Sequence, residues 1–182
     1  MKTSASIHFV IGVMVVLLLP GTSFAQDKPV TGQTLLDRIR IEDMMVRYYS
    51  GLGKASGEQM AGHYTEDGVL DVNNMVFTGR DQIEKIYNTA GEQTGEVYQG
   101  RVNTLVTNMT IDVNGDEATC WLIYTNVLNE SIEKLPRFLE QGRDYTKLVK
   151  RDGRWLIKHR WVTSDGGTPE YWRQNYVNRS FR

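Results

Sequence analysis

Residues 101–128 read RVNTLVTNMTIDVNGDEATCWLIYTNVL, two runs in which apolar residues recur with a period of two on either side of Asn114-Gly115. Residues 140–163 repeat this arrangement around Asp152-Gly153. Asn-Gly or Asp-Gly between two such runs is a strong signal for a β-hairpin. The C-terminal half of the chain therefore predicts two hairpins of long antiparallel strands, and these strands decide the fold class.

The strand predicted at 118–128 is apolar on both faces. One face includes Tyr124, and the other presents Trp121 and Ile123. An antiparallel sheet with one face in water alternates apolar with polar residues, so the second face should meet another layer. We expect a homodimer in which Trp121 and Ile123 contribute to the interface. The alternative is that the tail at 166–182 folds back over this face.

The chain before residue 101 shows a helical period instead. Its periodic segments predict a first helix that ends near Gly51, a short second helix through Tyr64 and a third helix after a hairpin at 69–77. Three residue pairs have the capping-box spacing that opens a helix, namely Thr34 with Asp37, Ser56 with Gln59, and Thr78 with Asp81. The predicted class is α+β, with three N-terminal helices packed on one face of a curved antiparallel sheet.

The composition is that of one globular domain. The chain has 182 residues, of which 40% are hydrophobic and 24% are charged, and its net charge is -1. So small a charge cannot hold a nucleic acid through counterion release. The single cysteine, Cys120, excludes an intramolecular disulfide and is interpreted as a small buried apolar residue, and the three scattered histidines give no metal-binding pattern. We therefore expect neither a metal nor a cofactor.

The first 25 residues resemble a signal peptide. Lys2 precedes an apolar run at 9–19, and Ser23-Phe24-Ala25 places small residues at positions -3 and -1 of a signal-peptidase site. The run is too short for a membrane span, which takes about 20 apolar residues. We expect cleavage at this site and a periplasmic or secreted protein without a membrane anchor; an uncleaved anchor is the alternative. A domain at 26–165 and an aromatic, basic tail at 166–182 would remain.

The order of several short strings resembles a known family. They are spread over residues 33–165 and comprise Tyr64-Thr65-Glu66-Asp67-Gly68, Gly79-Arg80, Thr107-Asn108, Asn114-Gly115-Asp116-Glu117-Ala118 and Arg151-Asp152-Gly153-Arg154-Trp155. In this order they resemble the SnoaL-like branch of the NTF2-like superfamily. The resemblance implies a cone of bent antiparallel sheet around a deep apolar pocket closed by helices, and a dimer formed through the outer face of the sheet. Because this fold hosts polyketide cyclases, ketosteroid isomerase, scytalone dehydratase, a dehydrochlorinase and epoxide hydrolases, it does not settle the function.

The dehydratase and dehydrochlorinase branch of the family transfers a proton with an Asp near the end of the first helix and a His on the first long strand. The resemblance places these two positions at Gly53 and Thr104. Neither side chain can transfer a proton near neutral pH. The resemblance therefore does not extend to this chemistry.

The resemblance also implies a set of residues that line the pocket, namely Tyr48, Tyr49, Leu70, Val102, Thr104, Tyr124, Asn126, Asp144 and Arg160. Tyrosines with one amide and one ion pair suit a largely apolar ligand that carries a carbonyl or a hydroxyl. Asp144, Arg160 and Tyr48 are the candidates for a catalytic role. Each tyrosine could instead fill the core, with its hydroxyl bound to backbone or water.

The register of the last hairpin decides whether Asp144 meets Arg160. A two-residue turn at Asp152-Gly153 would set Arg151 opposite Arg154 and Lys147 opposite Lys158, and like charges directly opposite each other are destabilising. A three-residue loop with a bulge at its glycine sets Asp144 opposite Arg160 instead. We therefore expect this loop and an ion pair partly buried in the cone, which either anchors a ligand or only stabilises the hairpin.

The register of the hairpin at 101–128 stays open. A two-residue turn at Asn114-Gly115 pairs apolar residues well, but it puts Thr104 and Tyr124 on opposite faces of the sheet. The resemblance places both residues in the pocket. The turn and the resemblance thus favour different faces for Thr104, and both registers stay open.

Two classes of function remain. The first is an exported enzyme that acts on a small hydrophobic molecule as a lyase, isomerase or hydrolase. The second is a ligand carrier or dimeric interaction module without turnover. The missing Asp and His at Gly53 and Thr104 favour the second class, and the ion pair expected between Asp144 and Arg160 favours the first.

Overall fold

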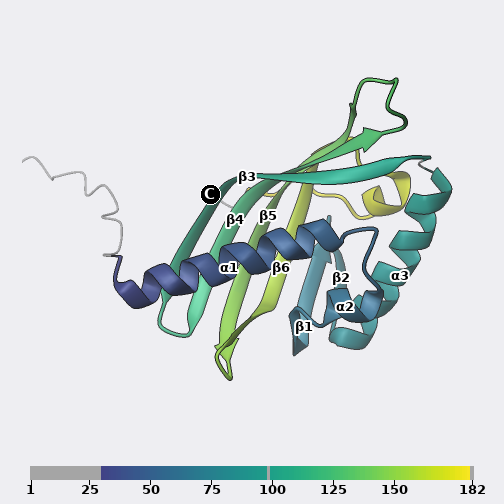
Figure 1. Cartoon of the computed structure of the whole chain (residues 1–182). Helices are drawn as coiled ribbons and strands as arrows, with labels where there is room; N and C mark the ends of the chain where they lie inside the picture. Colours follow the sequence, from purple (N-terminus) through teal and green to yellow (C-terminus); the bar gives the residue numbers. More distant parts are fainter. Residues whose placement is uncertain (1–29, 98, 181–182) are drawn as a thin grey trace, which may run out of the picture.

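A curved, six-stranded sheet forms the body of the protein, and a long helix lies along one of its faces (Figure 1). The computed structural model describes residues 30–97 and 99–180, so the predicted signal peptide at 1–25 lies outside the described residues. The strands are β1 (Tyr64–Val72), β2 (Met75–Thr78), β3 (Arg101–Asn114), β4 (Glu117–Asn129), β5 (Arg137–Arg151) and β6 (Arg154–Gly166). The helices are α1 (Gly32–Gly51), α2 (Gly57–Ala61) and α3 (Arg80–Val97), with a short 3-10 helix at Glu170–Arg173. Within the described part of the chain, no helix combines the length and hydrophobicity of a membrane span.

The sheet is mixed, with the strand order β2-β1-β6-β5-β4-β3. The long strands β3 to β6 pair antiparallel in chain order, as expected, but β1 pairs in parallel with β6. The expectation of a wholly antiparallel sheet is therefore wrong. After the β1–β2 hairpin and α3, the chain enters the sheet with β3 at the edge opposite to β2. The strands β4, β5 and β6 are then added one after another towards the hairpin, so the last strand, β6, comes to lie beside β1.

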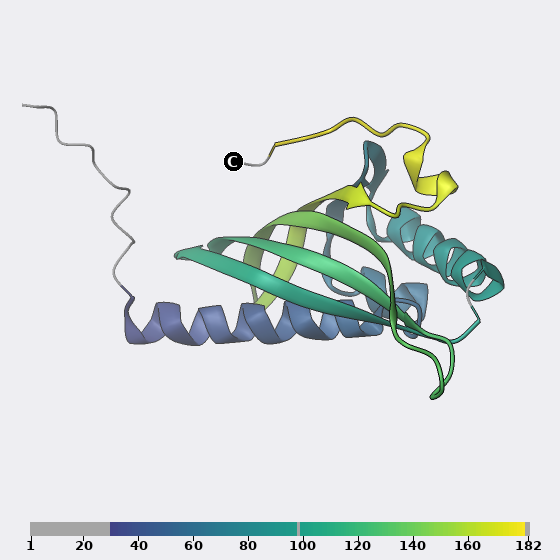
Figure 2. The ribbon, with the colours of Figure 1, turned by 90° about the horizontal axis from the view of Figure 1, so that it is seen from above.

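The helices do not form one layer. α1 runs along the face that we call the inner face, in contact with β3 and β6 (Figure 2). α2 and α3 pack against each other at one end of the molecule, where α3 contacts β1 and β2. The expected layer of three helices on one face is thus not confirmed, since α1 is the described helix that spans the long strands. The C-terminal segment lies on the opposite side of the sheet, which we call the outer face (Figure 2).

α1 begins one turn earlier than expected. The Thr31 hydroxyl accepts a hydrogen bond from the Thr34 N–H at 3.2 Å, and the Thr34 hydroxyl accepts one from the Thr31 N–H at 2.8 Å, so these two residues form the capping box. Asp37 does not cap the helix as expected, because its carboxylate is buried against the sheet.

Of the other two predicted capping boxes, one is present and the other is not. The capping box of Ser56 and Gln59 is confirmed at the start of α2. Before α3, the Thr78 N–H donates to the Gln82 side chain at 3.0 Å. This contact replaces the capping box that the spacing of Thr78 and Asp81 predicts.

The β5–β6 hairpin has a two-residue turn, so the expected three-residue loop is wrong. Asp152 and Gly153 have φ values of 49° and 74°. Two central residues in the left-handed region match the twist of paired strands. Lys158 is then an extra residue on β6, and the register shifts so that Lys147 faces His159. The two lysines are therefore not opposite each other, although Arg151 still faces Arg154 next to the turn.

The bulge at Lys158 also decides which residues of β6 face inward. Ile157 and Arg160 both point to the inner face although they are three residues apart, and they are 0% and 4% exposed. Thr146 faces Arg160 across the strands, so Asp144, two residues along β5, shares the inner face with Arg160. The expected proximity of Asp144 and Arg160 is present, although the expected register is not.

A second bulge settles the register of the β3–β4 hairpin. The turn consists of Gly115 and Asp116, and Asn108, at a φ of 53°, lies in a bulge of β3. Beyond this bulge Thr104 faces Asn126. Thr104 therefore lies on the same face as Tyr124, and the turn lies one residue later than the two-residue turn considered at Asn114-Gly115.

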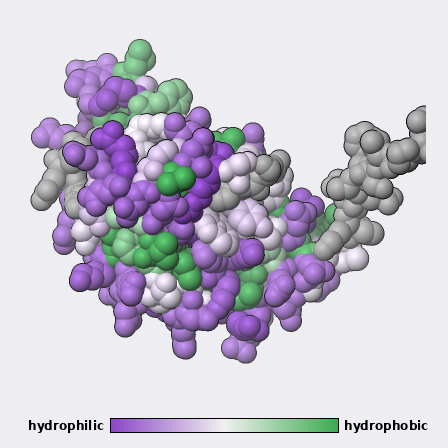
Figure 3. Space-filling view, turned by 180° about the vertical axis from the view of Figure 1, so that it is seen from behind, coloured by the Kyte–Doolittle hydropathy of each residue, from purple (hydrophilic) through white to green (hydrophobic). Residues whose placement is uncertain are grey.

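An aromatic row crosses the middle of the outer face. Trp121 faces Tyr145, and Tyr145 faces Trp161. The C-terminal tail covers the β1 side of this face, where Arg179 pairs with Asp71 at 2.9 Å. On the β4 side Trp121 remains partly exposed. Seen from behind, the molecule shows apolar areas between polar ones (Figure 3).

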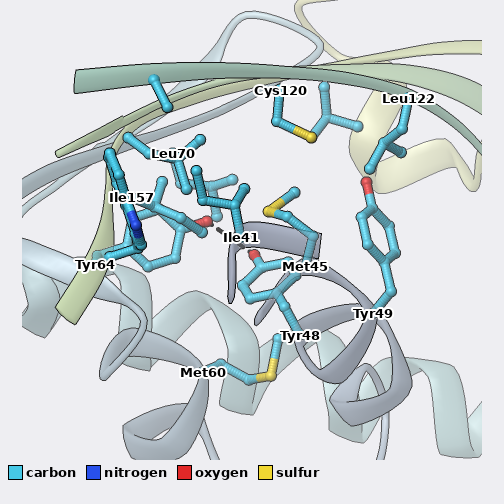
Figure 4. Packing of buried hydrophobic residues seen from close by; sticks show 14 of the residues in the cluster. Ile41, Met45, Tyr48, Tyr49, Met60, Tyr64, Leu70, Cys120, Leu122 and Ile157 are labelled. Atoms are coloured by element: carbon cyan, nitrogen blue, oxygen red, sulfur yellow. Dashed lines mark hydrogen bonds between the residues drawn. The ribbon is translucent and has the colours of Figure 1, made fainter. Parts of the chain in front are cut away.

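The hydrophobic core lies between α1 and the inner face (Figure 4). Ile41 and Met45 of α1 are fully buried, as is Leu122 of β4. Cys120 is only 1% exposed, and burial raises the pKa of its thiol, which keeps it protonated. Cys120 is thus the buried apolar residue that the sequence predicts.

Asp37 joins α1 to the β5–β6 end of the sheet. Its carboxylate accepts from Lys150 Nζ at 2.9 Å and from Trp155 Nε1 at 3.1 Å, and the residue is only 2% exposed. Burial raises the pKa of this carboxyl, but the hydrogen bonds from Gln33, Lys150 and Trp155 outweigh burial and lower the pKa to about 2. A folded-state pKa below the unfolded value stabilises the fold above the unfolded pKa, and this stabilisation is lost as the pH falls through the folded pKa.

We expect the free energy of unfolding to decrease by about 2 kcal/mol between about pH 5 and about pH 2 because Asp37 becomes protonated. Asp37→Asn should be less stable at neutral pH by a similar amount and should lose this part of the pH dependence. Urea unfolding at a series of pH values measures both effects. Asp43→Asn, an exposed site on the same helix, is the control and should keep the wild-type profile. An Asp37→Asn protein with wild-type acid sensitivity would contradict this role.

Candidate functional site

The Arg160 guanidinium lies at the centre of the inner face and binds side chains from α1 and β5. Its Nε donates to Asp144 Oδ2 at 2.6 Å, its Nη1 donates to the Tyr48 hydroxyl at 2.8 Å, and its Nη2 donates to the Tyr49 hydroxyl at 2.7 Å. The predicted ion pair is therefore present. It is almost fully buried, with side-chain exposures of 4% for Arg160 and 0% for Asp144, whereas the sequence predicts only partial burial.

The partners of Arg160 are themselves hydrogen-bonded. Asp144 also accepts from the hydroxyls of Tyr49 and Thr146, both at 2.6 Å. The Tyr48 hydroxyl bonds to the hydroxyl of Tyr64 at 2.8 Å and to that of Tyr87 on α3. We call these residues the Arg160 network. Burial of the network is thus compensated by hydrogen bonds to each charged group.

Electrostatics set the protonation states in the Arg160 network. Burial raises the pKa of Tyr48 and of Tyr49 although the positive charge of Arg160 opposes this, so both phenols stay neutral and can donate. Burial lowers the pKa of Arg160, but the neighbouring Asp144 carboxylate outweighs it and raises that pKa. The network therefore contains a buried guanidinium that pairs with the Asp144 carboxylate among neutral phenols.

The charged centre of the Arg160 network is inaccessible to a ligand in this conformation. A water-sized sphere cannot touch the side chain of Asp144, and Tyr48 is likewise 0% exposed. The three candidates for catalysis, Asp144, Arg160 and Tyr48, thus form one cluster inside the core. Its evident effect is to hold α1 and α3 against the sheet.

The other residues that the resemblance implies lie elsewhere. Leu70 is buried in the core at 1% exposure. Three of them are partly exposed on the inner face, namely Val102, Thr104 and Asn126. They lie at the start of β3 and the end of β4, away from the turn that joins these strands. The Thr104 hydroxyl donates to Asn126 Oδ1 at 2.7 Å. The expected lining thus divides into a buried cluster and an accessible group.

Gly53 does not belong to either group. It lies in the turn after α1 with a φ of 68°, and it is exposed to solvent. A carboxylate at this position would face water rather than the inner face. The position at which the resemblance places an Asp therefore contributes nothing to the accessible group.

Glu140 of β5 completes the accessible group, and it is not among the residues predicted from the sequence. It faces Asn126 across the strands, and Asn126 faces Thr104. Glu140 Oε1 accepts from the hydroxyls of Ser164 at 2.8 Å and Tyr124 at 3.1 Å, and Oε2 accepts from Asn126 Nδ2 at 3.1 Å. The period of two would have placed Glu140 on the inner face, because it precedes Asp144 by four residues.

Burial raises the pKa of Glu140, although the hydrogen bonds from Ser164, Tyr124 and Asn126 lower it in part. Burial also raises the pKa of Tyr124, so this phenol stays protonated and donates to Glu140. None of the ion pairs between described residues involves Glu140. The carboxyl is therefore held by neutral donors and is easier to protonate than an exposed one.

Gly142 allows Tyr124 to reach Glu140. A Cβ atom at Gly142 would lie 2.5 Å from the Tyr124 hydroxyl and 2.6 Å from the Thr163 carbonyl oxygen, and both distances are too short. Asn73 fixes the position of Ser164 through two hydrogen bonds. Asn73 Nδ2 donates to the Ser164 hydroxyl at 3.0 Å, and Asn73 Oδ1 accepts from the Ser164 N–H at 2.9 Å. The β1–β2 turn, which contains Asn73, thus fixes the position of one donor to Glu140.

Solved structures share this architecture. A protein of unknown function from Mycobacterium tuberculosis has a TM-score of 0.63 and 26% sequence identity, covering 73% of this chain and 74% of that one. A protein from Novosphingobium aromaticivorans, provisionally assigned as a scytalone dehydratase, has a TM-score of 0.61 and 25% identity over 75% and 89% of the two chains. A protein of unknown function from Nostoc punctiforme has a TM-score of 0.62 and 22% identity over 74% and 95%. The fold is thus that of the NTF2-like proteins with a cystatin-like fold.

Within this class the chain belongs to the SnoaL-like domain family, whose sequence model matches residues 33–161. The resemblance inferred from the short strings is therefore confirmed. No protein of curated function matches the chain in sequence.

The cost of breaking the Arg160 network can be measured. We expect Arg160→Ala to decrease the free energy of unfolding by about 3–5 kcal/mol, because it leaves the Asp144 carboxylate buried without its cation. Arg47→Ala is the control, since Arg47 pairs with Asp43 at 3.9 Å in full contact with water and should cost roughly 0.5 kcal/mol. Urea unfolding gives both values. Equal costs for the two variants would show that the buried pair adds no stability beyond a surface pair.

Proposed function

We propose that this protein is exported and binds a small, mostly hydrophobic molecule that carries a carbonyl or a hydroxyl. The binding site is the accessible group on the inner face, formed by Thr104, Asn126 and Glu140. One observation supports this site. On the inner face, Arg160 and Asp144 are buried, whereas Thr104, Asn126 and Glu140 are partly exposed.

The surroundings of the accessible group match the chemistry of small-molecule sites. Thr104, Asn126 and Glu140 form one row across β3, β4 and β5. Val102 and Val106, which flank Thr104 on the same face of β3, are partly buried apolar residues. A few polar groups among apolar side chains orient a ligand while apolar contact supplies most of the affinity.

An enzyme of the lyase, isomerase or hydrolase class is the first candidate. The likeness to a protein provisionally assigned as a scytalone dehydratase supports it. A non-catalytic carrier is the second candidate. The observation that favours a carrier is that Gly53 and Thr104 occupy the positions of the proton-transferring Asp and His.

Export and dimerisation belong to the same proposal. Cleavage after Ala25 would release the mature chain to the periplasm or the medium. A second copy would cover the β4 side of the outer face, where Trp121 and Ile123 remain partly exposed. Burial of such apolar area is the usual reason for a symmetric dimer.

Ligand binding can be tested with Prodan, an apolar fluorophore that carries a carbonyl and whose emission shifts to the blue in an apolar site. We expect the wild-type chain to bind Prodan and Thr104→Trp to weaken binding by about tenfold or more, which corresponds to about 1.4 kcal/mol, because the indole would fill the site. Thr107→Trp is the matched control, since Thr107 faces outward on the same strand. Equal Prodan affinity in both variants would place the site elsewhere.

The dimer can be tested with Trp121→Glu. A buried carboxylate in the interface would be costly, so we expect a monomer or insoluble protein. Size-exclusion chromatography with light scattering gives the mass. Val46→Glu introduces the same charge on the exposed face of α1, where Val46 is 45% exposed, and should leave the dimer intact. A Trp121→Glu dimer would show that the interface does not include the β4 side of the outer face.

A further inference from the structure

Glu140 differs from the other carboxylates in the interior of the described structure. Asp37 pairs with Lys150, Asp71 with Arg179 and Asp144 with Arg160. Glu140 has no cation partner among the described residues, and its three hydrogen bonds come from neutral groups. Taking a carboxylate out of water without a counter-charge is costly, so such a group is usually retained for its chemistry rather than for stability.

The two oxygens of Glu140 have different surroundings. Oε1 accepts from Ser164 and Tyr124, which fills both of its lone-pair directions. Within the described part of the chain, Oε2 accepts from Asn126 alone. Oε2 therefore keeps one lone pair for a further donor, and Glu140 is partly exposed. It faces Asn126 across the strands, so the proposed ligand would lie on the same face of the sheet.

Oε2 of Glu140 is held in position by the contacts of the other oxygen, Oε1. Ser164 is 2% exposed and is bonded to Asn73, which is fully buried, and Tyr124 is 5% exposed. These contacts restrict rotation of the carboxyl group about its last bond. Oε2 is consequently oriented before a ligand arrives, which lowers the entropic cost of a reaction at this atom.

We infer that Glu140 is the general base of this protein and takes a proton from a weakly acidic C–H of the bound molecule through Oε2. The inference rests on the proposed small-molecule site. In an isomerisation, the C–H electron pair moves into the ligand, and the Glu140 carboxylic acid returns the same proton to another carbon, so no further reactant is needed. In an elimination, the electron pair forms the new multiple bond, the leaving group departs with its bonding pair, and Glu140 gives its proton to water or to that group.

The electrostatic surroundings of Glu140 fit this role. Burial moves its pKa towards neutral pH, which makes the ionised form a stronger base than an exposed carboxylate. The titratable group that faces it from β4 is Tyr124, which stays protonated, and the groups from β6 and the β1–β2 turn are Ser164 and Asn73, which do not titrate. Arg160, the cation of the neighbouring network, pairs with Asp144 instead.

The experiment uses nitrobenzisoxazole as the probe, with the full chain. A base removes the ring C–H proton of this probe, the electron pair forms a nitrile, and the N–O bond breaks to give a coloured phenolate. We expect catalysis above the uncatalysed rate, and a decrease in kcat/KM of about 100-fold or more in Glu140→Gln. Glu117→Gln, at the exposed start of β4, is the matched control and should keep the wild-type rate.

The pH profile separates a base from a merely structural residue. The wild-type rate should rise with pH through one ionisation above the ordinary glutamate value of 4.5. Tyr124→Phe removes one donor to Oε1 and thereby raises the pKa of Glu140, so its profile should move to higher pH. This variant also keeps the test valid if Glu140→Gln fails to fold, which circular dichroism would show. An unmoved profile in Tyr124→Phe would contradict the inference.

Prodan binding distinguishes failure of this inference from failure of the proposed function. If the wild-type chain binds Prodan and does not accelerate the elimination, Glu140 is not a base and the carrier function stands. If Glu140→Gln folds, binds Prodan and reacts as fast as wild type, the base lies elsewhere. If Prodan does not bind and nitrobenzisoxazole does not react, both proposals are overturned.

Discussion

The buried ion pair of Arg160 and Asp144 is the constraint on which the rest of the structure depends. A guanidinium and a carboxylate that do not touch water are tolerated only if their remaining donors and acceptors are paired. The partners come from different elements, namely Tyr48 and Tyr49 of α1, Tyr87 of α3 and Thr146 of β5. Because these hydroxyls must converge on one point, the network determines where α1 crosses the sheet and how α3 closes its end.

This network divides the inner face into two chemically different parts. Asp144 and Glu140 lie on the same face of β5, four residues apart, yet Asp144 has a cation and Glu140 has neutral donors only. The environment and not the residue type therefore decides what each carboxyl can do. Asp144 pairs with a buried cation and stabilises the fold, whereas Glu140 has no cation partner among the described residues and burial raises its pKa. Gly142, between the two, lets the Tyr124 hydroxyl reach Glu140 rather than the Arg160 network.

Two bulges make this arrangement possible. Without the extra residue at Lys158, Ile157 and Arg160 would lie on opposite faces, because strand residues alternate. Without the bulge at Asn108, Thr104 would face outward while Tyr124 faces inward. The register expected from charge pairing was wrong for the β5–β6 hairpin because a bulge can separate like charges without changing the turn. A bulge interrupts the alternation of strand residues, and a period of two in the sequence cannot show where this happens.

The sequence by itself determined the four long strands, the existence of three helices before them and the family, because periodicity, turn dipeptides and ordered local strings are local properties of the chain. It also predicted that Asp144 lies near Arg160, although from a register that is wrong, and it extended the second helix to Tyr64, where β1 begins. Only the tertiary structure decided that β1 joins the sheet in parallel beside β6, that the tail covers the β1 side of the outer face, and that the Arg160 network is buried. It also revealed Glu140, whose character comes from Ser164, Tyr124 and Asn126 on neighbouring strands. Burial and the choice of partner are set by residues far apart in the chain, and this is why composition and spacing could not assign them.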